Sequence, residues 1–366
     1  MGKVRSIHYL RGMAALLVVF FHFRFYLNGV YAQKDLGTIL FGGGAFGVDL
    51  FFIISGFIIA MSTERKGSPL IFVIRRFFRI YPAFILTFLV GAYFVYFNLP
   101  VSNIVRSMFF IHKDYSLDSP SFGYNVLGPA WTLTYEFYFY FAFVIAMSIS
   151  HSYRILISSL LIIVPILLIQ WSYTGSFDLS GSGSPKIPLD TSCYGIIRFI
   201  SSPIMIEFII GMVLYDIYKK TSSSEIYSYI SKPILYTSIG IFLSLYFQNK
   251  YYGFGLQGFG MWALVLIIGF LFFEKSNSIK ENKTLSFLGD ISYSLYLTHY
   301  VVINAFDLYQ PSIWSQSSGL SKFFLATTSC LVVAYITYNL IEKPFIKIGK
   351  SIESKLKTMS INPIFS

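Results

Sequence analysis

Long apolar stretches recur along the chain, and they constrain its fold more than any other feature of the sequence. About 20 apolar residues in a helix are enough to span the hydrocarbon core of a bilayer. Hydrophobic residues make up 55% of the 366 residues and charged residues only 12%, whereas roughly 25% of the residues in a typical soluble domain are charged. Because a soluble globule could not cover so much apolar surface with so few charges, the sequence predicts a membrane protein.

About ten segments meet this length requirement, so we predict an all-α fold, a polytopic transmembrane bundle of about 10 helices. The segment 195–215 is the least regular, because it contains Arg198, Pro203 and Glu207. The predicted spans are 7–27, 44–62, 80–97, 129–149, 154–171, 195–215, 232–248, 257–273, 287–306 and 320–341.

The positive charges are distributed unevenly between the two sides of this predicted bundle. When the N-terminus is placed in the cytoplasm, most of the 28 Lys and Arg residues fall on the cytoplasmic side. This bias is typical of multi-pass proteins in a lipid bilayer, and it places both termini in the cytoplasm. It also explains the net charge of +11, so we do not expect nucleic acid as a partner. We expect one transmembrane domain over residues 1–345, a basic cytoplasmic tail over 346–366 and no appended soluble domain.

The two cysteines indicate neither a disulfide framework nor a metal site. Cys193 and Cys330 are far apart, and neither belongs to a CxxC motif or to a metal-ligand spacing. We therefore predict that the chain binds no metal.

Two polar residues in the first span suggest a cavity beside it. A charged side chain inside a span costs at least about 2.5–3.5 kcal/mol on insertion scales, so it needs an explanation. Arg11 and His22 fall on the same helix face, roughly 16 Å apart along the axis. A neutral imidazole suits a general base. The alternative for His22 is a histidine that is hydrogen-bonded between two helices.

Two carboxylates lie at depths that could bring them near His22. Asp49 is close to the outer end of the second span and could orient the imidazole, as a carboxylate does in hydrolase triads. Glu136 lies in the fourth span, roughly 10 Å inside the outer boundary. Each has a structural alternative, which is an interhelical bond for Asp49 and a pair with an Arg or His of another span for Glu136.

Three arginines, which we call the arginine cluster, lie between the second and third spans: Arg75, Arg76 and Arg79. Arg75 and Arg79 share a helix face. Three guanidinium groups at the cytoplasmic surface could hold phosphates. The alternative is a positively charged anchor beside anionic lipids.

These segments together resemble the acyltransferase-3 family of bacterial integral membrane proteins, from about Ser6 to Phe345. The motifs that carry the resemblance are Tyr9-Leu10-Arg11-Gly12 with His22, Gly47-Val48-Asp49-Leu50-Phe51-Phe52 with Ser55-Gly56-Phe57, Arg79-Ile80-Tyr81-Pro82, Trp131-Thr132-Leu133 with Glu136, and Ile291-Ser292-Tyr293-Ser294-Leu295-Tyr296-Leu297-Thr298-His299.

The resemblance implies transfer of an acyl group, usually acetyl from cytoplasmic acetyl-CoA, to a carbohydrate hydroxyl at the bacterial cytoplasmic (inner) membrane. The partners would be acyl-CoA and a polysaccharide or lipid-linked sugar, and no cofactor would be bound permanently. Members of this family are generally thought to need the histidine matching His22 and the arginines matching Arg11 and the arginine cluster. The chain is most similar to the stand-alone members that modify O-antigen and exopolysaccharide.

For the mechanism, we expect a site with two ends. The arginine cluster and Arg11 would hold the phosphates of coenzyme A at the cytoplasmic face. The thioester would reach His22 along the helix face that carries both Arg11 and His22. His22, oriented by Asp49 or Glu136, would take the proton of the acceptor hydroxyl. A covalent acetyl-histidine intermediate is the competing mechanism.

Trp131 and Tyr135 are one helical turn apart and could stack on the sugar, although aromatic residues are common at membrane interfaces for other reasons. Two other functions are compatible with intramembrane charges: a polytopic transporter or flippase, and a non-catalytic membrane component of a polysaccharide assembly pathway.

Overall fold

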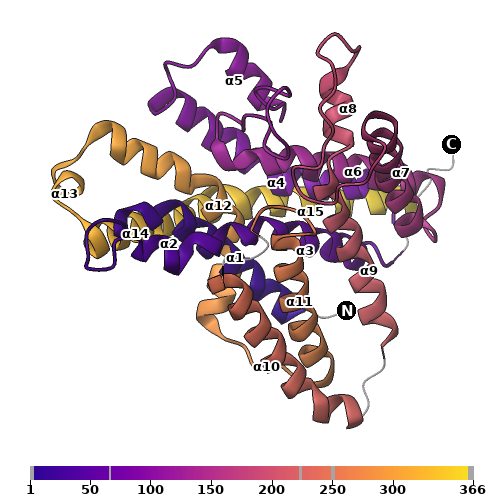
Figure 1. Cartoon of the computed structure of the whole chain (residues 1–366). Coiled ribbons are helices and arrows are strands. Elements are labelled where there is room, and N and C mark those ends of the chain that lie inside the picture. The colour runs from indigo at the N-terminus through magenta and orange to yellow at the C-terminus, as the bar shows by residue number, and fades with distance from the viewer. Residues whose placement is uncertain (1–3, 66, 222–224, 249–251, 362–366) are drawn as a thin grey trace.

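The computed structural model describes residues 4–65, 67–221, 225–248 and 252–361. Figure 1 shows a bundle of helices joined by loops. The described residues contain no β-strand, and their one isolated bridge joins Ser180 and Gly255. The structure therefore confirms the predicted all-α fold.

Eleven of the described helices have 15 residues or more, and four are shorter. The long helices are α1 (Arg5–Phe23), α3 (Gly47–Ser62), α4 (Pro69–Phe94), α6 (Trp131–Ile149), α7 (Arg154–Thr174), α9 (Ile206–Lys220), α10 (Glu225–Gln248), α11 (Phe259–Ser276), α12 (Lys283–Tyr309), α14 (Gly319–Thr337) and α15 (Lys343–Ile361). The short helices are α2 (Leu36–Phe41), α5 (Val101–Met108), α8 (Tyr194–Ile200) and α13 (Ser312–Ser315).

Nine helical segments in the described part of the chain are long and apolar enough to cross a membrane. The remaining predicted span, 287–306, is α12, which has 27 residues but carries polar side chains such as Asp290 and His299. α12 packs against α1, α4 and α14, so protein rather than lipid covers its polar face. The chain is thus a multi-pass helical membrane protein.

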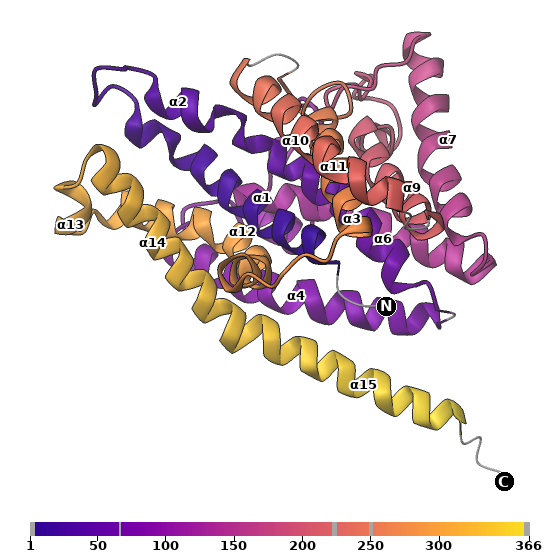
Figure 2. The ribbon, with the colours of Figure 1, turned by 90° about the horizontal axis from the view of Figure 1, so that it is seen from below.

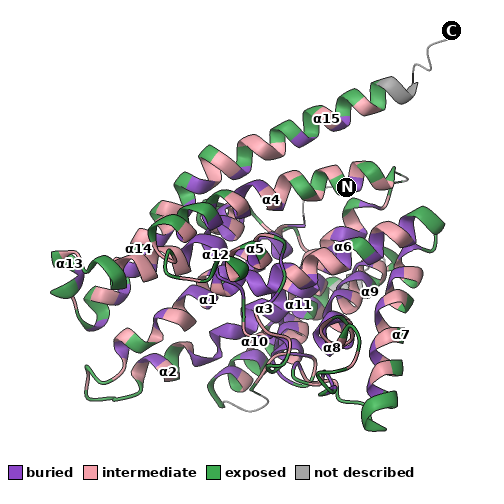
Figure 3. Ribbon diagram, turned by 90° about the horizontal axis from the view of Figure 1, so that it is seen from above, coloured by how far each residue is buried: buried purple, intermediate pink, exposed green. Residues whose placement is uncertain are grey.

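Apolar side chains form outward-facing stripes on helices at the periphery. On α7, the exposed residues Leu156, Leu160, Val164 and Leu168 recur every four positions and therefore share one face. Figure 3 shows exposed and half-buried residues along α7, whereas buried residues are concentrated in inner helices such as α3 and α11. An apolar outer surface is what a helix in contact with lipid requires.

Glycines bring two pairs of helices into close contact and so position the interior. A Cβ atom added to Gly12 would lie 2.6 Å from the backbone nitrogen of Gly289, where α1 crosses α12. A Cβ added to Gly56 would lie 2.1 Å from the carbonyl oxygen of Phe208, where α3 crosses α9. Small residues allow such close approach in membranes. The first crossing holds the face of α1 that carries Arg11 against α12.

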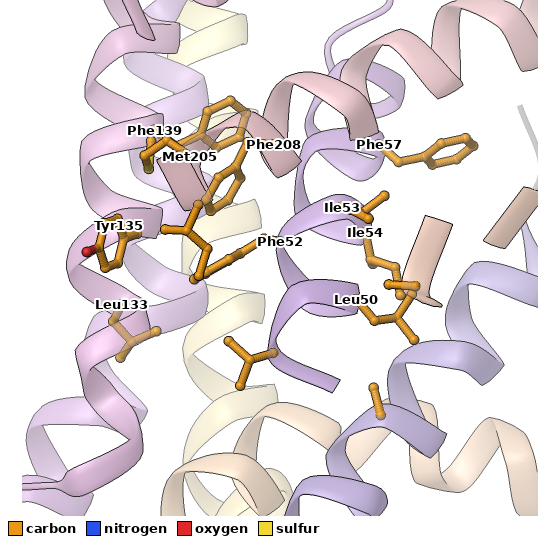
Figure 4. Close-up of a cluster of buried hydrophobic side chains, with 14 of the residues drawn as sticks. Leu50, Phe52, Ile53, Ile54, Phe57, Leu133, Tyr135, Phe139, Met205 and Phe208 are labelled. Atoms are coloured by element: carbon orange, nitrogen blue, oxygen red, sulfur yellow. The ribbon is translucent and has the colours of Figure 1, made fainter. Parts of the chain in front are cut away.

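Aromatic side chains fill the core between α3, α6 and α9 (Figure 4). The ring centroids of Phe139 and Phe208 are 4.5 Å apart, and those of Phe52 and Phe208 are 4.7 Å apart. Such ring pairs stabilise a core beyond the area that they bury. This packing fixes α3 and α6, which supply two walls of the cavity described below.

The described part of the segment predicted to be a basic tail is the helix α15, which follows a π-helical turn over Tyr338–Glu342. Figure 2 shows α15 running beside α4. Ile346, Gly349 and Glu353 recur at helical spacing, and the last two are buried. Because these positions give α15 one face that packs on α4, the segment forms part of the folded bundle.

Candidate functional site

A cavity with a volume of about 110 Å³ lies between α1, α3, α4, α6 and α12. We call it the central cavity. Val48, Phe51, Ser55 and Ile58 of α3 line it at helical spacing. Its polar lining consists of Arg11, Ser55, Arg76, Arg79, Thr132, Glu136, Tyr140, Ser292, Tyr293 and Tyr296. The cavity thus brings together four predicted site residues from three helices.

Arg11 and Arg79 are held in place by groups from α12 and from the turn before α15. Arg11 donates a hydrogen bond of 2.5 Å from Nη2 to the carbonyl oxygen of Gly289, and its buried Nε has no partner among the described residues. Arg79 Nη1 lies 3.7 Å from Glu342 Oε1. Glu342 also accepts a 2.8 Å hydrogen bond from Ser294 Oγ. These contacts hold two guanidinium groups beside the cavity.

Glu136 faces the central cavity rather than His22. Its Oε1 accepts a 3.1 Å hydrogen bond from Ser55 Oγ and a second one from the Tyr140 hydroxyl. The carboxylate interacts electrostatically with Arg11 and Arg76. Glu136 therefore balances part of the positive charge of the cavity, which matches the predicted alternative of a structural pair.

The arginine cluster does not act as one unit, because Arg75 points away from the central cavity. Arg75 Nε donates a 2.6 Å hydrogen bond to Glu353 Oε2 of α15, and Arg75 Nη2 donates to Oε1 of the same carboxylate. Arg76 donates a 2.8 Å hydrogen bond to Ser62 Oγ and lines the cavity with Arg79. Two arginines of the cluster thus face the cavity, and the third is paired with Glu353.

His22 lies at the other end of α1, in a cluster with His299 and Tyr300 of α12. Its Nδ1 is 3.2 Å from the Tyr300 hydroxyl, and its ring centroid is 5.2 Å from that of His299. His299 Nδ1 lies 3.2 Å from the Leu295 carbonyl oxygen, while its buried Nε2 has no partner in the described part of the chain. A Cβ at Gly128 would lie 2.9 Å from the Tyr300 ring, so this glycine makes room for the ring.

The predicted contact between Asp49 and His22 does not form in this structure. Asp49 Oδ1 accepts a 2.7 Å hydrogen bond from the Gly255 backbone N–H, and the carboxyl interacts electrostatically with that of Glu207, which is also fully buried. The reason is helical phase, because Asp49 shares the α3 face of Gly56, which packs on α9. Tyr300 occupies the position beside His22 that was predicted for a carboxylate.

Trp131 and Tyr135 belong to the core, which does not fit their predicted role in stacking on a sugar. Tyr135 is fully buried, and its hydroxyl donates to the Pro120 carbonyl oxygen at 2.8 Å. Trp131 is 4% exposed and packs edge-on against Tyr135 and Phe254. No free ring face remains for a ligand at Tyr135.

Tyr296 lies between the central cavity and the cluster around His22. It lines the cavity, and its ring centroid is 6.1 Å from that of His299. Its hydroxyl is 3.1 Å from Thr132 Oγ1 and donates to the Pro129 carbonyl oxygen at 3.0 Å. Tyr296 and His299 therefore lie between the cavity and His22.

Comparison with known proteins assigns a family to this arrangement. A family model described as an acyltransferase domain matches residues 4–339. The chain belongs to the acyltransferase-3 family. It is therefore an acyltransferase, which favours the enzymatic interpretation over the transporter and the non-catalytic alternatives.

Curated relatives of this acyltransferase-3 chain match most of its length. The exopolysaccharide production protein ExoZ of Rhizobium meliloti (strain 1021) is 25% identical, over 84% of this chain and 91% of ExoZ. The acyltransferase MdmB of Streptomyces mycarofaciens is 22% identical, over 94% of this chain and 92% of MdmB. A Staphylococcus aureus (strain COL) protein, named provisionally as an O-acetyltransferase, is 25% identical, and the match covers 57% of its length. No solved structure matches the chain.

In this acyltransferase, the tautomer of His22 decides what its imidazole can do. If Nδ1 carries the proton and donates to the Tyr300 oxygen, the Nε2 lone pair is free to accept a proton. If Tyr300 donates instead, Nε2 carries the proton and cannot act as a base. The first arrangement makes His22 a general base, and Tyr300 then has the orienting role that was expected for Asp49.

Sequence reasoning missed Tyr300, and it named His299 as part of a family motif without giving it a role in the site. The available signal was spacing, because Tyr300 follows Tyr296 by one helical turn and therefore shares a face with a residue of the family motif. The spacing alone could not show that this face of α12 meets the end of α1, since that depends on how the two helices cross at Gly12 and Gly289.

Proposed function

We propose that this acyltransferase moves an acetyl group from cytoplasmic acetyl-CoA to a hydroxyl of a cell-surface polysaccharide or its lipid-linked precursor. It works in the bacterial cytoplasmic membrane with both termini in the cytoplasm, as the charge bias of the sequence favours. The names of ExoZ and of the Staphylococcus relative support the acceptor class and the acetyl group. The observation that carries the proposal is a cavity with guanidinium groups at one end and His22 beyond the other.

The donor enters from the end of the bundle that carries the arginines. Arg11, Arg76 and Arg79 line the central cavity, against two carboxylates: Glu136, which also lines it, and Glu342, which is paired with Arg79. Such an excess of fixed positive charge favours an anionic ligand, and guanidinium groups suit phosphates. The apolar part of the lining, including Phe51 of α3, suits the arm that leads to the thioester.

The chemistry takes place beyond Tyr296, at His22. His22 Nε2 accepts the proton of the acceptor hydroxyl while the hydroxyl oxygen attacks the thioester carbonyl carbon. The carbon–sulfur bond breaks as the ester bond forms, and the proton passes from His22 to the departing thiolate. The products are the acetylated glycan and free coenzyme A. Tyr300 keeps the imidazole in the tautomer that this step needs.

The test is the ester-linked acetyl content of the surface glycan, measured by mass spectrometry in cells supplied with the parent protein or a variant. We expect acetylation with the parent and none with His22→Ala. The matched control is His151→Ala, because His151 belongs neither to the central cavity nor to the cluster around His22, and we expect acetylation with this variant. Equal amounts of inserted protein are the control. Normal acetylation by the His22→Ala variant would contradict the proposed function.

A second measurement separates direct transfer from an acyl-enzyme route. Purified protein is incubated with labelled acetyl-CoA in the absence of acceptor. Direct transfer predicts no label on His22, whereas a stable label on that residue would require the covalent intermediate.

A further inference from the structure

A second cavity, with a volume of about 530 Å³, lies between α4 and α15. We call it the α4–α15 chamber. Figure 2 shows the two helices running side by side. Gly349 holds them close, because a Cβ at this position would lie 2.8 Å from Phe78 Cβ. The charged residues that line the chamber are Arg75, Arg76, Arg79, Lys350, Glu353 and Lys357.

The chamber and the central cavity share part of their walls. Arg76 and Arg79 line both spaces. A third cavity, beside the turn between α3 and α4, shares Arg75, Arg76 and Lys357 with the chamber and adds Arg65. A ligand whose arm runs through the central cavity toward His22 can therefore have its other end in the chamber, beside Arg76.

The chamber is strongly cationic, and its one acidic lining residue is already engaged. Five basic side chains line the chamber, against the single carboxylate of Glu353. That carboxylate accepts hydrogen bonds from Arg75 and, at 2.6 Å, from Lys357 Nζ. The side chain of Glu353 is only 11% exposed. Lys350 has no ion pair with any described residue, so the cations outnumber the anions that could neutralise them.

The pairing of Glu353 with Arg75 has the geometry that a phosphate would take. Two parallel N–H groups of Arg75 donate to the two oxygens of one carboxylate. Arginine binds phosphate through the same two-pronged arrangement. A phosphate oxygen pair can therefore replace Glu353 at Arg75, since both ligands use the same two donors.

We propose that α15 extends the phosphate site expected at the arginine cluster, so that the α4–α15 chamber binds the phosphates of the nucleotide part of the acyl donor. Lys350 and Lys357 contact these phosphates, and the ligand displaces Glu353 from Arg75. This inference rests on the proposed function, because it assigns one end of the same donor. Phosphates of anionic lipids have the same chemistry, so the experiment must separate the two sources.

The experiment measures binding of coenzyme A and of dephospho-coenzyme A to the purified full chain in nanodiscs of phosphatidylcholine. We expect the parent to bind coenzyme A more tightly than dephospho-coenzyme A. We expect the double variant Lys350→Gln/Lys357→Gln to bind coenzyme A about tenfold more weakly than the parent does, and to lose most of the preference for coenzyme A over dephospho-coenzyme A. The matched control is Lys347→Gln/Lys355→Gln, which removes the same charge from α15 at positions outside the chamber. We expect the control to bind like the parent.

Glu353→Gln tests the displacement. Glutamine keeps the shape of the side chain but removes the charge that competes with phosphate, so we expect coenzyme A to bind several-fold more tightly. Weaker binding by this variant would mean that Glu353 only braces α15, and it would contradict the displacement.

Three further outcomes would overturn the inference. The first is that the Lys350/Lys357 double variant binds coenzyme A like the parent. The second is that nanodiscs with phosphatidylglycerol abolish the effect of the double variant, which would assign the chamber to lipid. In both cases, acetyl transfer from a donor without a nucleotide, S-acetylpantetheine, would still require His22, and the proposed function would stand. The third is that the parent binds no coenzyme A, which would contradict both proposals.

Discussion

Replacing Tyr300 by phenylalanine tests whether its hydroxyl keeps His22 in the tautomer of a general base. The substitution retains the ring, whose centroid lies 4.7 Å from that of His22 and 5.3 Å from that of His299. It removes only the oxygen that lies 3.2 Å from His22 Nδ1. Without this acceptor, Nδ1–H loses its partner, and the tautomer with the proton on Nε2 becomes more populated.

The size of the effect follows from the single hydrogen bond that is lost. A neutral hydrogen bond contributes about 0.5–1.5 kcal/mol, which corresponds to roughly 2- to 13-fold in the tautomer ratio. Tyr300 lines neither the central cavity nor the α4–α15 chamber. We therefore expect kcat to fall by about fivefold, while KM for the donor stays unchanged.

Initial rates of the purified protein in nanodiscs, with the donor varied at saturating acceptor, measure both constants. The matched control is Tyr309→Phe, because Tyr309 lies on the same helix but donates its hydrogen bond to the Phe94 carbonyl oxygen, away from His22. We expect this control to have the rates of the parent. An unchanged kcat for Tyr300→Phe, or a change in KM alone, would refute the orienting role of Tyr300.

Three further predictions concern stability, measured as thermal unfolding in detergent. Gly12→Ala lowers the midpoint because its Cβ would lie 2.6 Å from a backbone atom of α12. Gly240→Ala does not lower it, because nothing lies within 4 Å of that Cβ. Equal midpoints for the two variants would contradict this prediction. Glu207→Gln does not lower the midpoint, because the amide can donate a hydrogen bond to the unpaired oxygen of Asp49. A large drop in the midpoint of this variant would show that Asp49 and Glu207 need the charge of Glu207. Burial lowers the pKa of His112, in the loop before α6, to about 3. The pKa of a histidine in the unfolded chain is about 6.5, so below that pH the unfolded chain binds more protons than the folded chain does. The free energy of unfolding therefore falls as the pH is lowered from 6.5 to 3, by up to about 1.4 kcal/mol per pH unit. His112→Gln should reduce this slope, and identical slopes would refute the assignment.

The sequence was sufficient for the fold class because apolar length and composition act locally. Each predicted span overlaps a long helix, including the polar helix α12, but the predicted span 195–215 is broken between α8 and α9. The segment that forms α15 was predicted only as a basic tail. Its charged residues outweigh its apolar face when the segment is considered alone. Only the position of α4 shows that Gly349 and Glu353 have something to pack against.

Within the candidate site, sequence reasoning identified residue types better than partners. Arg11, Arg76, Arg79 and Glu136 do meet in one cavity. The partner predicted for His22 was wrong, because a carboxylate at a suitable depth can still point to the opposite side of its helix. Depth follows from counting residues, whereas direction depends on how each helix is rotated against its neighbours. That rotation is set by close crossings between helices, which a single sequence does not show.

The separation of the two ends gives the bundle a reason to cross the membrane. Arg11 and His22 lie on one helix, roughly 16 Å apart along its axis, and Tyr296 stands between the spaces that they face. In the proposed reaction, a water-soluble donor that carries phosphates cannot pass through the bilayer, but its flexible arm would reach beyond Tyr296 while the phosphates stay with the arginines. The acceptor then needs to approach only His22. Two substrates confined to opposite sides of the membrane can therefore react without either one crossing it.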